Sequence, residues 1–300
     1  MTLKNTKIWV CGEVLIDLIP DKSGQKNPIV GGGPANTAVA LAKLGLNSCF
    51  IDGISSDDYG KMARESLEKS SVNLELAHFS DLETCTADVS LDSNGSASYV
   101  FKIEKTATFD FQKEWLPAPQ NGNPVVLHIG TLVTVVEPAA SVLYEWSKAV
   151  SNFAPIVYDP NVRPSVIPDN VRYQESVEKW SKLSSIIKLS EDDIKWLYPD
   201  SDEIEVANKW LKGKTQLVVI TKGANGLLGI TSNGVVSVPG IKVDVIDTVG
   251  AGDTVGAVLV EGLVKHGLDN LINIELESVL KRAARAAAIT CSRAGAKPPT

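Results

Sequence analysis

Cysteine, histidine and long apolar runs are scarce in this sequence of 300 residues, which contains 4 cysteines and 3 histidines. The cysteines are too few and too scattered for a disulfide framework or a paired-cysteine metal site, which favours a reducing compartment. We therefore expect a cytoplasmic protein. Glu13 and Asp17 interrupt the apolar stretch near the N-terminus, and no run of about 18 apolar residues occurs in the sequence. The sequence thus predicts neither a signal peptide nor a membrane span.

Basic clusters are also missing. The chain has 29 Lys and Arg residues against 36 Asp and Glu residues, which gives a formal net charge of −7. Long-range electrostatics therefore oppose binding to nucleic acid or to an anionic membrane surface. Since 44% of the residues are hydrophobic and 22% are charged, the chain can bury a substantial core. A small-molecule partner fits this composition best.

Short β-branched runs alternate with amphipathic segments along the chain, without an internal repeat. This alternation predicts an α/β fold with a mostly parallel central sheet and helices on both faces, in a single domain spanning residues 1–300. We expect strands at residues 8–14, 49–51, 125–129, 156–158, 186–189 and 217–221. We expect helices at residues 34–44, 57–70, 139–151, 204–211 and 254–266.

Two regions depart from the alternation and predict a small β-sheet lid, inserted at about residues 18–30 and 86–104. The first is polar and rich in turn residues. The second has strand-like runs at 86–91 and 98–103, separated by the hairpin signal DSNG at residues 92–95. Such a lid would cover the carboxyl ends of the main strands, where open α/β sheets bind ligands. Paired across its outer face, it could also form a homodimer.

The run DTVGAGDT at residues 247–254 is the clearest chemical signal. Gly250, Ala251 and Gly252 have almost no side chain, so their amides can approach one ligand closely. The apolar spacing that follows predicts a buried helix, whose N-terminus would bind an anion. Asp253 would lie beside that anion and could accept a proton from an attacking hydroxyl. The alternative is an ordinary strand-to-helix turn, with Asp253 as a capping residue.

A second glycine-rich run, GGGPAN at residues 31–36, precedes another predicted helix. Gly32 and Gly33 would let the backbone approach a polyhydroxylated ligand, while the amide of Asn36 can both donate and accept hydrogen bonds. Asp17, expected at the end of the first strand, could accept hydrogen bonds from two sugar hydroxyls. Each residue alone is more simply a turn or surface residue. Together, at predicted strand ends, they indicate a sugar site.

These runs occur in order with DPNVR at 159–163, KLSE at 188–191 and TKGANG at 221–226. With GE and Asp17 near the N-terminus, the set resembles the ordered motifs of the ribokinase-like, PfkB-type sugar kinases, and most of all the bacterial fructokinases. The resemblance spans nearly the whole chain. It implies a ribokinase-like three-layer fold, with ATP and Mg²⁺ as cofactors and a sugar as substrate.

The resemblance also implies roles for individual residues. Asp253 matches the catalytic base, and the Gly250, Ala251 and Gly252 run matches the anion hole. Other matched positions would hold the sugar, the nucleotide or ions. They are Asp17, Gly32, Gly33 and Asn36 for the sugar hydroxyls; Asn161 and Arg163 near the phosphates; Lys188, Ser190, Thr221, Gly223 and Gly226 for the nucleotide; Asp193 for magnesium through water; Asp247 for a possible potassium ion; and the 286–292 segment beside adenine.

The implied reaction is in-line attack of a primary sugar hydroxyl on the γ-phosphate of ATP, with Asp253 removing the proton. A carboxylate at a helix N-terminus should be a weak base, but a loose phosphoryl-transfer transition state needs little activation of the nucleophile. D-fructose is the expected acceptor. 2-Keto-3-deoxygluconate kinase, ribokinase and a non-catalytic sugar-binding or regulatory protein are the alternatives. Neither GxGxxG near the N-terminus nor GxxxxGK followed by Ser or Thr occurs, which argues against a dinucleotide dehydrogenase and a P-loop kinase.

The sequence departs from the fructokinase pattern in the expected lid. Where those enzymes usually have an Arg, this chain has Ile103 or Glu104, and Lys102 or Lys105 is a candidate substitute. Because an ammonium is not a fork-shaped guanidinium, the preferred sugar stays open. Glu137 follows an expected strand, and it could either reach the sugar or cap the next helix.

Overall fold

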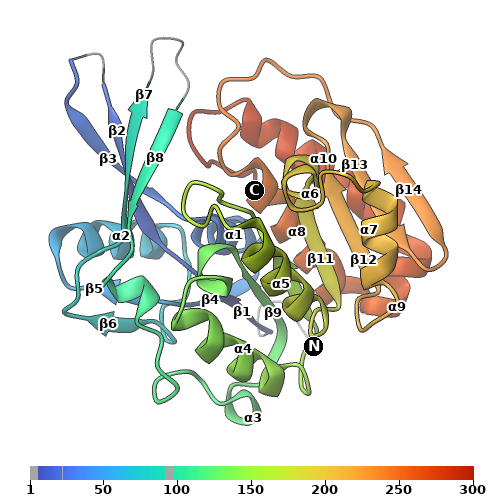
Figure 1. Ribbon diagram of the computed structural model, residues 1–300, viewed down its shortest axis with the longest axis horizontal. Coiled ribbons are helices and arrows are strands. Elements are labelled where there is room, and N and C mark those ends of the chain that lie inside the picture. The colour runs from blue at the N-terminus through green and yellow to red at the C-terminus, as the bar shows by residue number, and fades with distance from the viewer. Residues whose placement is uncertain (1–5, 22, 92–96) are drawn as a thin grey trace.

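The computed structural model describes residues 6–21, 23–91 and 97–300 as a three-layer α/β fold built on a central sheet (Figure 1). The central sheet has eight strands in the order β14-β13-β12-β11-β10-β9-β1-β4, parallel from β4 to β12 and antiparallel from β12 to β14. The order of the strands confirms the predicted mostly parallel sheet. Its strands are β1 (Lys7–Cys11), β4 (Asn47–Ile51), β9 (Pro124–Gly130), β10 (Ile156–Asp159), β11 (Ile186–Ser190), β12 (Leu217–Thr221), β13 (Leu227–Thr231) and β14 (Gly234–Val238).

Alternating side chains of β1 point into two separate cores. Ile8 and Val10 belong to one buried cluster, while Trp9 and Cys11 belong to the other. This follows from the period of two along a strand, since successive side chains leave opposite faces of the sheet. Both faces are therefore covered, and each fully buried aliphatic side chain contributes about 1.5–3 kcal/mol of transfer free energy.

Helices fill the layer on each face. The cluster around Ile8 and Val10 is completed by side chains of α1 (Gly33–Lys43), α2 (Asp58–Lys69), α8 (Ala251–His266) and α10 (Leu276–Cys291). The cluster around Trp9 is completed by α4 (Ala139–Val150), α5 (Asn170–Ser181), α6 (Glu191–Leu197) and α7 (Glu203–Trp210). Short helices complete the set: α3 (Pro119–Gly122), α9 (Leu268–Asn270), η2 (Ala107–Phe109), η3 (Thr131–Thr134), η4 (Gly223–Asn225) and η5 (Leu271–Glu275).

A four-stranded sheet projects from the body beside the central sheet (Figure 1). Its order is β3-β2-β7-β8, with β2 (Leu15–Pro20), β3 (Lys26–Gly31), β7 (Thr86–Leu91) and β8 (Ala97–Lys102). It occupies the regions where the lid was predicted, and the antiparallel pairing of β7 with β8 agrees with the hairpin. The DSNG signal itself lies outside the described residues. A further pair joins β5 (Gly53–Ser55) to β6 (His78–Ser80).

The prediction of one strand over residues 8–14 was wrong. The first strand ends at Cys11, and Asp17 lies within β2, where it pairs with Ile29 and Ala87. The break occurs at Gly12, which has a φ of 144° and lies against the ring of Pro34, so that a Cβ there would overlap the ring. Asp17 is therefore a residue of the small sheet.

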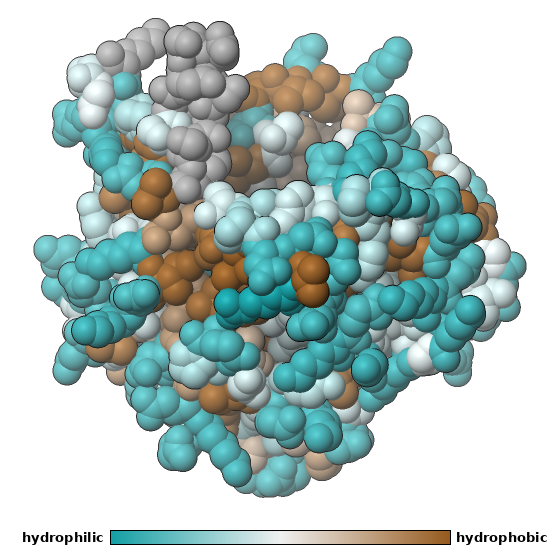
Figure 2. Space-filling view, viewed as in Figure 1, coloured by the Kyte–Doolittle hydropathy of each residue, from teal (hydrophilic) through white to brown (hydrophobic). Residues whose placement is uncertain are grey.

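The face shown in Figure 2 is hollowed beside the small sheet, and apolar side chains gather along part of the rim. Segment 241–249, between β14 and α8, has several exposed apolar side chains, namely Ile241, Val243, Val245, Ile246 and Val249. Within the described ranges, no helix is both long and apolar enough to cross a membrane.

Candidate active site

The glycine turn opens α8, as the sequence predicted, although the helix begins at Ala251, three residues earlier than expected. Gly250 is the N-cap and has a φ of 78°, a left-handed conformation that glycine adopts without strain. A Cβ on Gly250 would lie 2.6 Å from the Cβ of Ala296, so the turn is also tightly packed. The first N–H groups of a helix have no acceptor within the helix, and those of Gly252 and Asp253 lie in this first turn.

Asp253 is buried at this helix terminus, with 8% of its surface exposed. Its Oδ2 accepts a hydrogen bond of 2.8 Å from the side-chain amide of Asn36. Burial raises the pKa of Asp253 to about 6, against the lowering effects of Lys188, the Asn36 hydrogen bond and Arg163. The expectation of a weak base is therefore corrected, because desolvation outweighs the helix terminus and the nearby cations.

The predicted sugar turn meets Asp253 at the start of α1. A Cβ placed on Gly33 would lie 3.2 Å from Oδ1 of Asp253 and 2.9 Å from Nδ2 of Asn161. Gly32 is the N-cap of α1, with a φ of 109° that only glycine adopts readily. The structure thus brings together Gly32, Gly33, Asn36, Asn161 and Asp253, which lie in three distant parts of the sequence.

Asp17 and Arg163 lie beside the sugar turn. The carboxylate of Asp17 lies against Gly31, where an added Cβ would be 3.2 Å from its Cγ. Burial raises the pKa of Asp17 to about 6, while the charge of Arg163 lowers it. The guanidinium of Arg163 donates to Oδ1 of Asn161 across 2.7 Å. The same guanidinium influences both Asp17 and Asp253, so it is the cation shared by the two carboxylates.

Lys188 lies beneath the glycine turn. Its Nζ is 2.9 Å from the position that a Cβ on Gly252 would take, and it forms an ion pair of 2.8 Å with Asp159. Both side chains of the pair are at most 5% exposed. Burial lowers the pKa of Lys188, but the carboxylates of Asp159 and Asp253 raise it more, so its pKa is raised overall. A protonated ammonium thus adds positive charge where the sequence predicted an anion hole.

Ser190 and Asp193 form a capping box at the start of α6. Oδ2 of Asp193 accepts from the backbone N–H of Ser190 across 2.8 Å and from its hydroxyl across 2.7 Å. Oδ1 accepts from the N–H of Val162 across 2.8 Å. Oδ1 therefore joins α6 to the DPNVR turn, while Oδ2 closes the capping box within α6. A role for Asp193 with magnesium-bound water stays a prediction.

The predicted nucleotide loop follows β12. Thr221 ends that strand. Gly223 begins the short η4 turn and Gly226 is its C-cap, with φ angles of 53° and 99°. A Cβ on Gly226 would lie 2.6 Å from the backbone nitrogen of Gly240, so this loop packs backbone against backbone. Its Lys222 forms an ion pair of 2.5 Å with Glu203.

Asp247 joins the loop before α8 to the C-terminal segment. Its Oδ1 accepts from the N–H of Val249 across 3.0 Å, and its Oδ2 accepts from the N–H of Gly295 across 2.8 Å. The backbone N–H of Asp247 donates to the carbonyl of Cys291, the last residue of α10. The 286–292 segment, expected beside adenine, therefore lies next to the glycine turn.

A groove of about 730 Å³ lies at the root of the small sheet, lined by residues 100–105 with Glu83, Ser165 and Val166. Lys102 forms an ion pair of 2.6 Å with Glu83. Glu104 and Lys105 also line the groove. The residues that replace the expected lid Arg thus belong to a mixed-charge groove.

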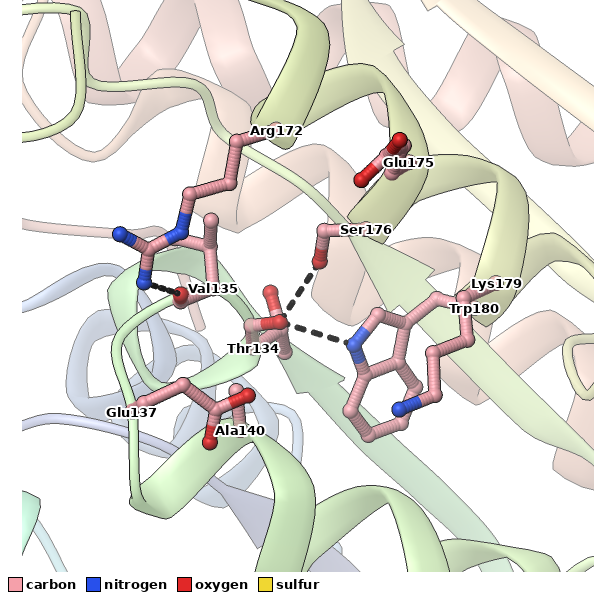
Figure 3. Close-up of a pocket in the computed structure, with 9 residues that line it drawn as sticks. All are labelled: Thr134, Val135, Glu137, Ala140, Arg172, Glu175, Ser176, Lys179 and Trp180. Carbon is pink, nitrogen blue, oxygen red and sulfur yellow. Dashed lines mark hydrogen bonds between the residues drawn. The ribbon is translucent and has the colours of Figure 1, made fainter. Parts of the chain in front are cut away.

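Glu137 lies at a second cavity, of about 180 Å³, between η3 and α5 (Figure 3). Its carboxylate accepts from the N–H of Ser141 across 3.1 Å and from the hydroxyl of Ser141 across 2.8 Å. Of the two interpretations left open, the structure thus supports helix capping.

The chain matches the family described as "pfkB family carbohydrate kinase" over residues 5–300. It belongs to that family. It is 35% identical over 269 residues to a fructokinase of Rhizobium leguminosarum bv. trifolii, covering 88% of this chain and 81% of that protein. This pfkB-family chain is therefore a phosphotransferase that acts on a sugar hydroxyl.

Solved structures agree with this membership. The ATP-bound fructokinase of Xylella fastidiosa superimposes with a TM-score of 0.89 at 25% identity, covering 97% of this kinase and 93% of that chain. A second similar structure is a double mutant of the Vibrio cholerae O395 fructokinase with fructose, ADP and a potassium ion bound. It gives a TM-score of 0.87 at 26% identity, covering 99% of this kinase and 95% of that chain. The pfkB-family kinase thus has the ribokinase-like fold that its motifs implied.

Proposed function

We propose that this kinase transfers the γ-phosphate of ATP to the primary hydroxyl of D-fructose, forming D-fructose 6-phosphate. The observation that carries the transfer is the buried carboxylate of Asp253, held by Asn36 at the N-terminus of α8. The choice of fructose is supported by the names of relatives that cover most of the chain. Fructose and ADP are bound in one similar structure, and ATP in another.

The proposed reaction uses the two glycine turns on opposite sides of the reacting atoms. Gly32, Gly33, Asn36 and Asp17 hold the sugar hydroxyls, and Asp253 accepts the proton of the attacking one. The new bond joins that hydroxyl oxygen to the γ-phosphorus, and the bond to the β–γ bridging oxygen breaks as ADP leaves. Positioning and charge stabilisation supply most of the rate enhancement in such reactions.

Positive charge is available where it is needed for this transfer. The first turn of α8, which opens with the Gly250, Ala251 and Gly252 run, would present the N–H groups of Gly252 and Asp253 to the transferring phosphoryl group. The N–H of Ala251 donates to the carbonyl of Thr248. Lys188 lies against Gly252, and Arg163 lies beside Asn161. A guanidinium is a bidentate partner for phosphate oxygens, whereas the ammonium acts as a point charge.

We propose that the nucleotide lies along the loop after β12, between that loop and the C-terminal end of α10. The backbone of the loop would contact the nucleotide at Thr221, Gly223 and Gly226. The phosphates would lie near Asn161, Lys188 and Ser190. In the described part of the chain, no group of three His, Cys, Asp or Glu side chains is arranged to hold a metal ion. Mg²⁺ would take most of its ligands from ATP phosphates and water, as it does in many kinases.

Four finer features complete the proposal. The region of Asp247 would hold a potassium ion, as the potassium in the similar Vibrio structure suggests. The small sheet would act as a lid inserted into a single kinase domain. Two lids would pair in a homodimer, for which the exposed Val100, on the face of the small sheet opposite to Asp17, offers an apolar contact. The enzyme would work in the cytoplasm. Light scattering tests the dimer, and activity in potassium against tetramethylammonium buffers tests the ion.

An ADP-release assay with ATP and Mg²⁺ tests the function. We expect the highest kcat/KM with fructose in a panel that contains ribose, mannose and 2-keto-3-deoxygluconate. A preference for ribose or for 2-keto-3-deoxygluconate would replace the proposed substrate. Tight sugar binding by calorimetry without turnover of any sugar would favour a non-catalytic binding protein. The D253N variant is the control for contaminating kinases.

A further inference from the structure

A second buried carboxylate lies behind the sugar turn, on a residue with no role in the reaction proposed above. Glu13 is 3% exposed, and its Oε1 accepts a hydrogen bond from the hydroxyl of Thr131. Its Oε2 is buried and has no hydrogen-bond partner among the described residues. Burial raises the pKa of Glu13 to about 7, against the hydrogen bond from Thr131. A side chain that is this costly to bury needs a reason to be there.

Glu13 lies against one half of the sugar turn. A Cβ placed on Gly32 would lie 3.1 Å from the carbonyl carbon of Glu13. The backbone of Glu13 therefore forms the wall that makes glycine necessary at this position. The side chain of Glu13 extends to Thr131, and Thr131 packs against Gly33, the next residue of the sugar turn.

Thr131 has an unusual backbone conformation. It follows β9 and has a φ of 62°, a left-handed value that is rare for a β-branched residue. Its Cγ2 lies 3.0 Å from the position that a Cβ on Gly33 would take. Such conformations persist only where the surrounding structure holds them. The hydrogen bond to the Glu13 carboxylate is the contact that can hold the Thr131 backbone in this conformation.

The other end of the same short turn is fixed independently. The carbonyl of Thr134 accepts from the Ser176 hydroxyl across 2.8 Å and from the Trp180 indole across 3.0 Å (Figure 3). The hydroxyl of Thr134 donates to the carbonyl of Thr131 across 2.7 Å. With η3 anchored to α5 in this way, the direction of the Thr131 side chain depends on its hydrogen bond to Glu13.

We propose that Glu13 is a positioning residue of the sugar site, which holds Thr131 in its left-handed conformation and thereby fixes the Gly32–Gly33 turn that receives the sugar. The inference rests on the proposed sugar-kinase function and deepens it. Glu13 does not touch the reacting atoms in this arrangement. Its loss should weaken sugar binding while leaving the phosphate and nucleotide groups in place, since those belong to α8 and to the loop after β12.

The test is a double-mutant cycle with Glu13→Ala and Thr131→Val. Valine keeps the shape of threonine and removes only the hydroxyl. Each single variant should raise the KM for the sugar about tenfold, the effect of losing one well-placed hydrogen bond, with the KM for ATP unchanged and kcat within about threefold. The double variant should be no worse than either single variant, because the two residues act through one interaction.

Asp52 provides the matched control. Its carboxylate is also fully buried and accepts from the N–H groups of Val14 and Gly53, each across 2.8 Å. Among the hydrogen bonds of the described residues, none joins this carboxylate to Thr131 or to residues 31–36. The Asp52→Asn variant should lower the melting temperature without changing the KM for the sugar. An equal rise in sugar KM for Asp52→Asn and Glu13→Ala would overturn the proposal, because general loosening would then explain both.

Three further outcomes also count against Glu13. A lower melting temperature with unchanged sugar KM would show a purely structural role, and additive effects in the double variant would show two separate interactions. A parallel rise in the KM for ATP would show that the effect is not confined to the sugar turn.

Wild-type turnover across the sugar panel is measured first, with every variant compared with the wild type on its best sugar. Failure of the proposed function is thereby separated from failure of this inference.

Discussion

The side-chain amide of Asn36 donates to Oδ2 of Asp253 across 2.8 Å, although the two residues are 217 positions apart in the sequence. This bond joins the sugar turn to the phosphate-binding helix. It also occupies one carboxylate oxygen and leaves Oδ1 facing Gly33. The proton acceptor is thus oriented by the residue proposed to bind the substrate, so the presence of sugar and the geometry of the base are linked.

Asp253→Asn should remove the base while keeping the fold. The amide is isosteric, and its oxygen can still accept the bond from Asn36. We expect kcat to fall by about 10²- to 10⁴-fold, the usual contribution of a positioned general base, with little change in sugar KM. The ADP-release assay and a thermal melt measure the two effects.

The control for this variant is Glu261→Gln, which changes another buried carboxylate of α8. Glu261 forms ion pairs with Lys265 and Arg282, on the part of the helix beyond its first turn. It should lose stability without a large loss of kcat. If Asp253→Asn retained about a tenth of wild-type kcat, the assignment of Asp253 as the base would fail.

The pKa of Asp253 predicts a pH profile for the reaction. The base must be deprotonated and its pKa lies at about 6, as does the pKa of Asp17. The value of kcat/KM should therefore be constant at higher pH and decline as the pH falls through 6, with both carboxylates contributing to the acid limb. Asn36 lowers the pKa of Asp253 through its hydrogen bond. In Asn36→Ala the midpoint of the acid limb should therefore move to higher pH. An unchanged midpoint, or a shift to lower pH, would contradict the electrostatic role of Asn36.

Local sequence patterns predicted much of the fold, and the exceptions have tertiary causes. The strand at 217–221 has the predicted bounds because its apolar run is continuous and fully buried. The hairpin of β13 and β14 was not predicted, since Gly229 interrupts β13 and packs close to Leu280 of α10. The first strand was predicted too long because no local pattern shows that Gly12 meets Pro34.

The same division applies to the site. Asp253 and Asn36 could be identified from their own motifs, because each lies at a glycine turn that opens a helix. The pairing of Glu13 with Thr131 could not, since it joins residues 118 positions apart without a shared motif. The raised pKa of Asp253 could not be predicted from the sequence either. The helix terminus favours the charged form, whereas burial favours the neutral form, and the extent of burial is known only from the fold.

Gly33→Ala should weaken sugar binding through sterics alone. The added methyl would lie 2.9 Å from the amide of Asn161 and 3.2 Å from Oδ1 of Asp253. We expect a rise in sugar KM of about tenfold or more, equivalent to about 1.4 kcal/mol or more of binding energy. Gly213→Ala is the control, because its added methyl has only an ordinary contact of 3.4 Å, with the carbonyl of Trp210. Equal sugar KM values for the two variants would remove Gly33 from the sugar site.

The buried pair of Lys188 and Asp159 allows stability and phosphate binding to be separated. Lys188→Met leaves the carboxylate of Asp159 buried without its partner, which should lower the unfolding free energy by about 3–5 kcal/mol. Adding Asp159→Asn removes the unpaired charge, so the double variant should regain much of this stability in urea unfolding. Activity should not return with it, because the ammonium beside Gly252 is still missing from the anion hole. If the double variant recovered both stability and kcat, Lys188 would serve the fold alone, and the positive charge for phosphoryl transfer would have to come from α8 and Arg163.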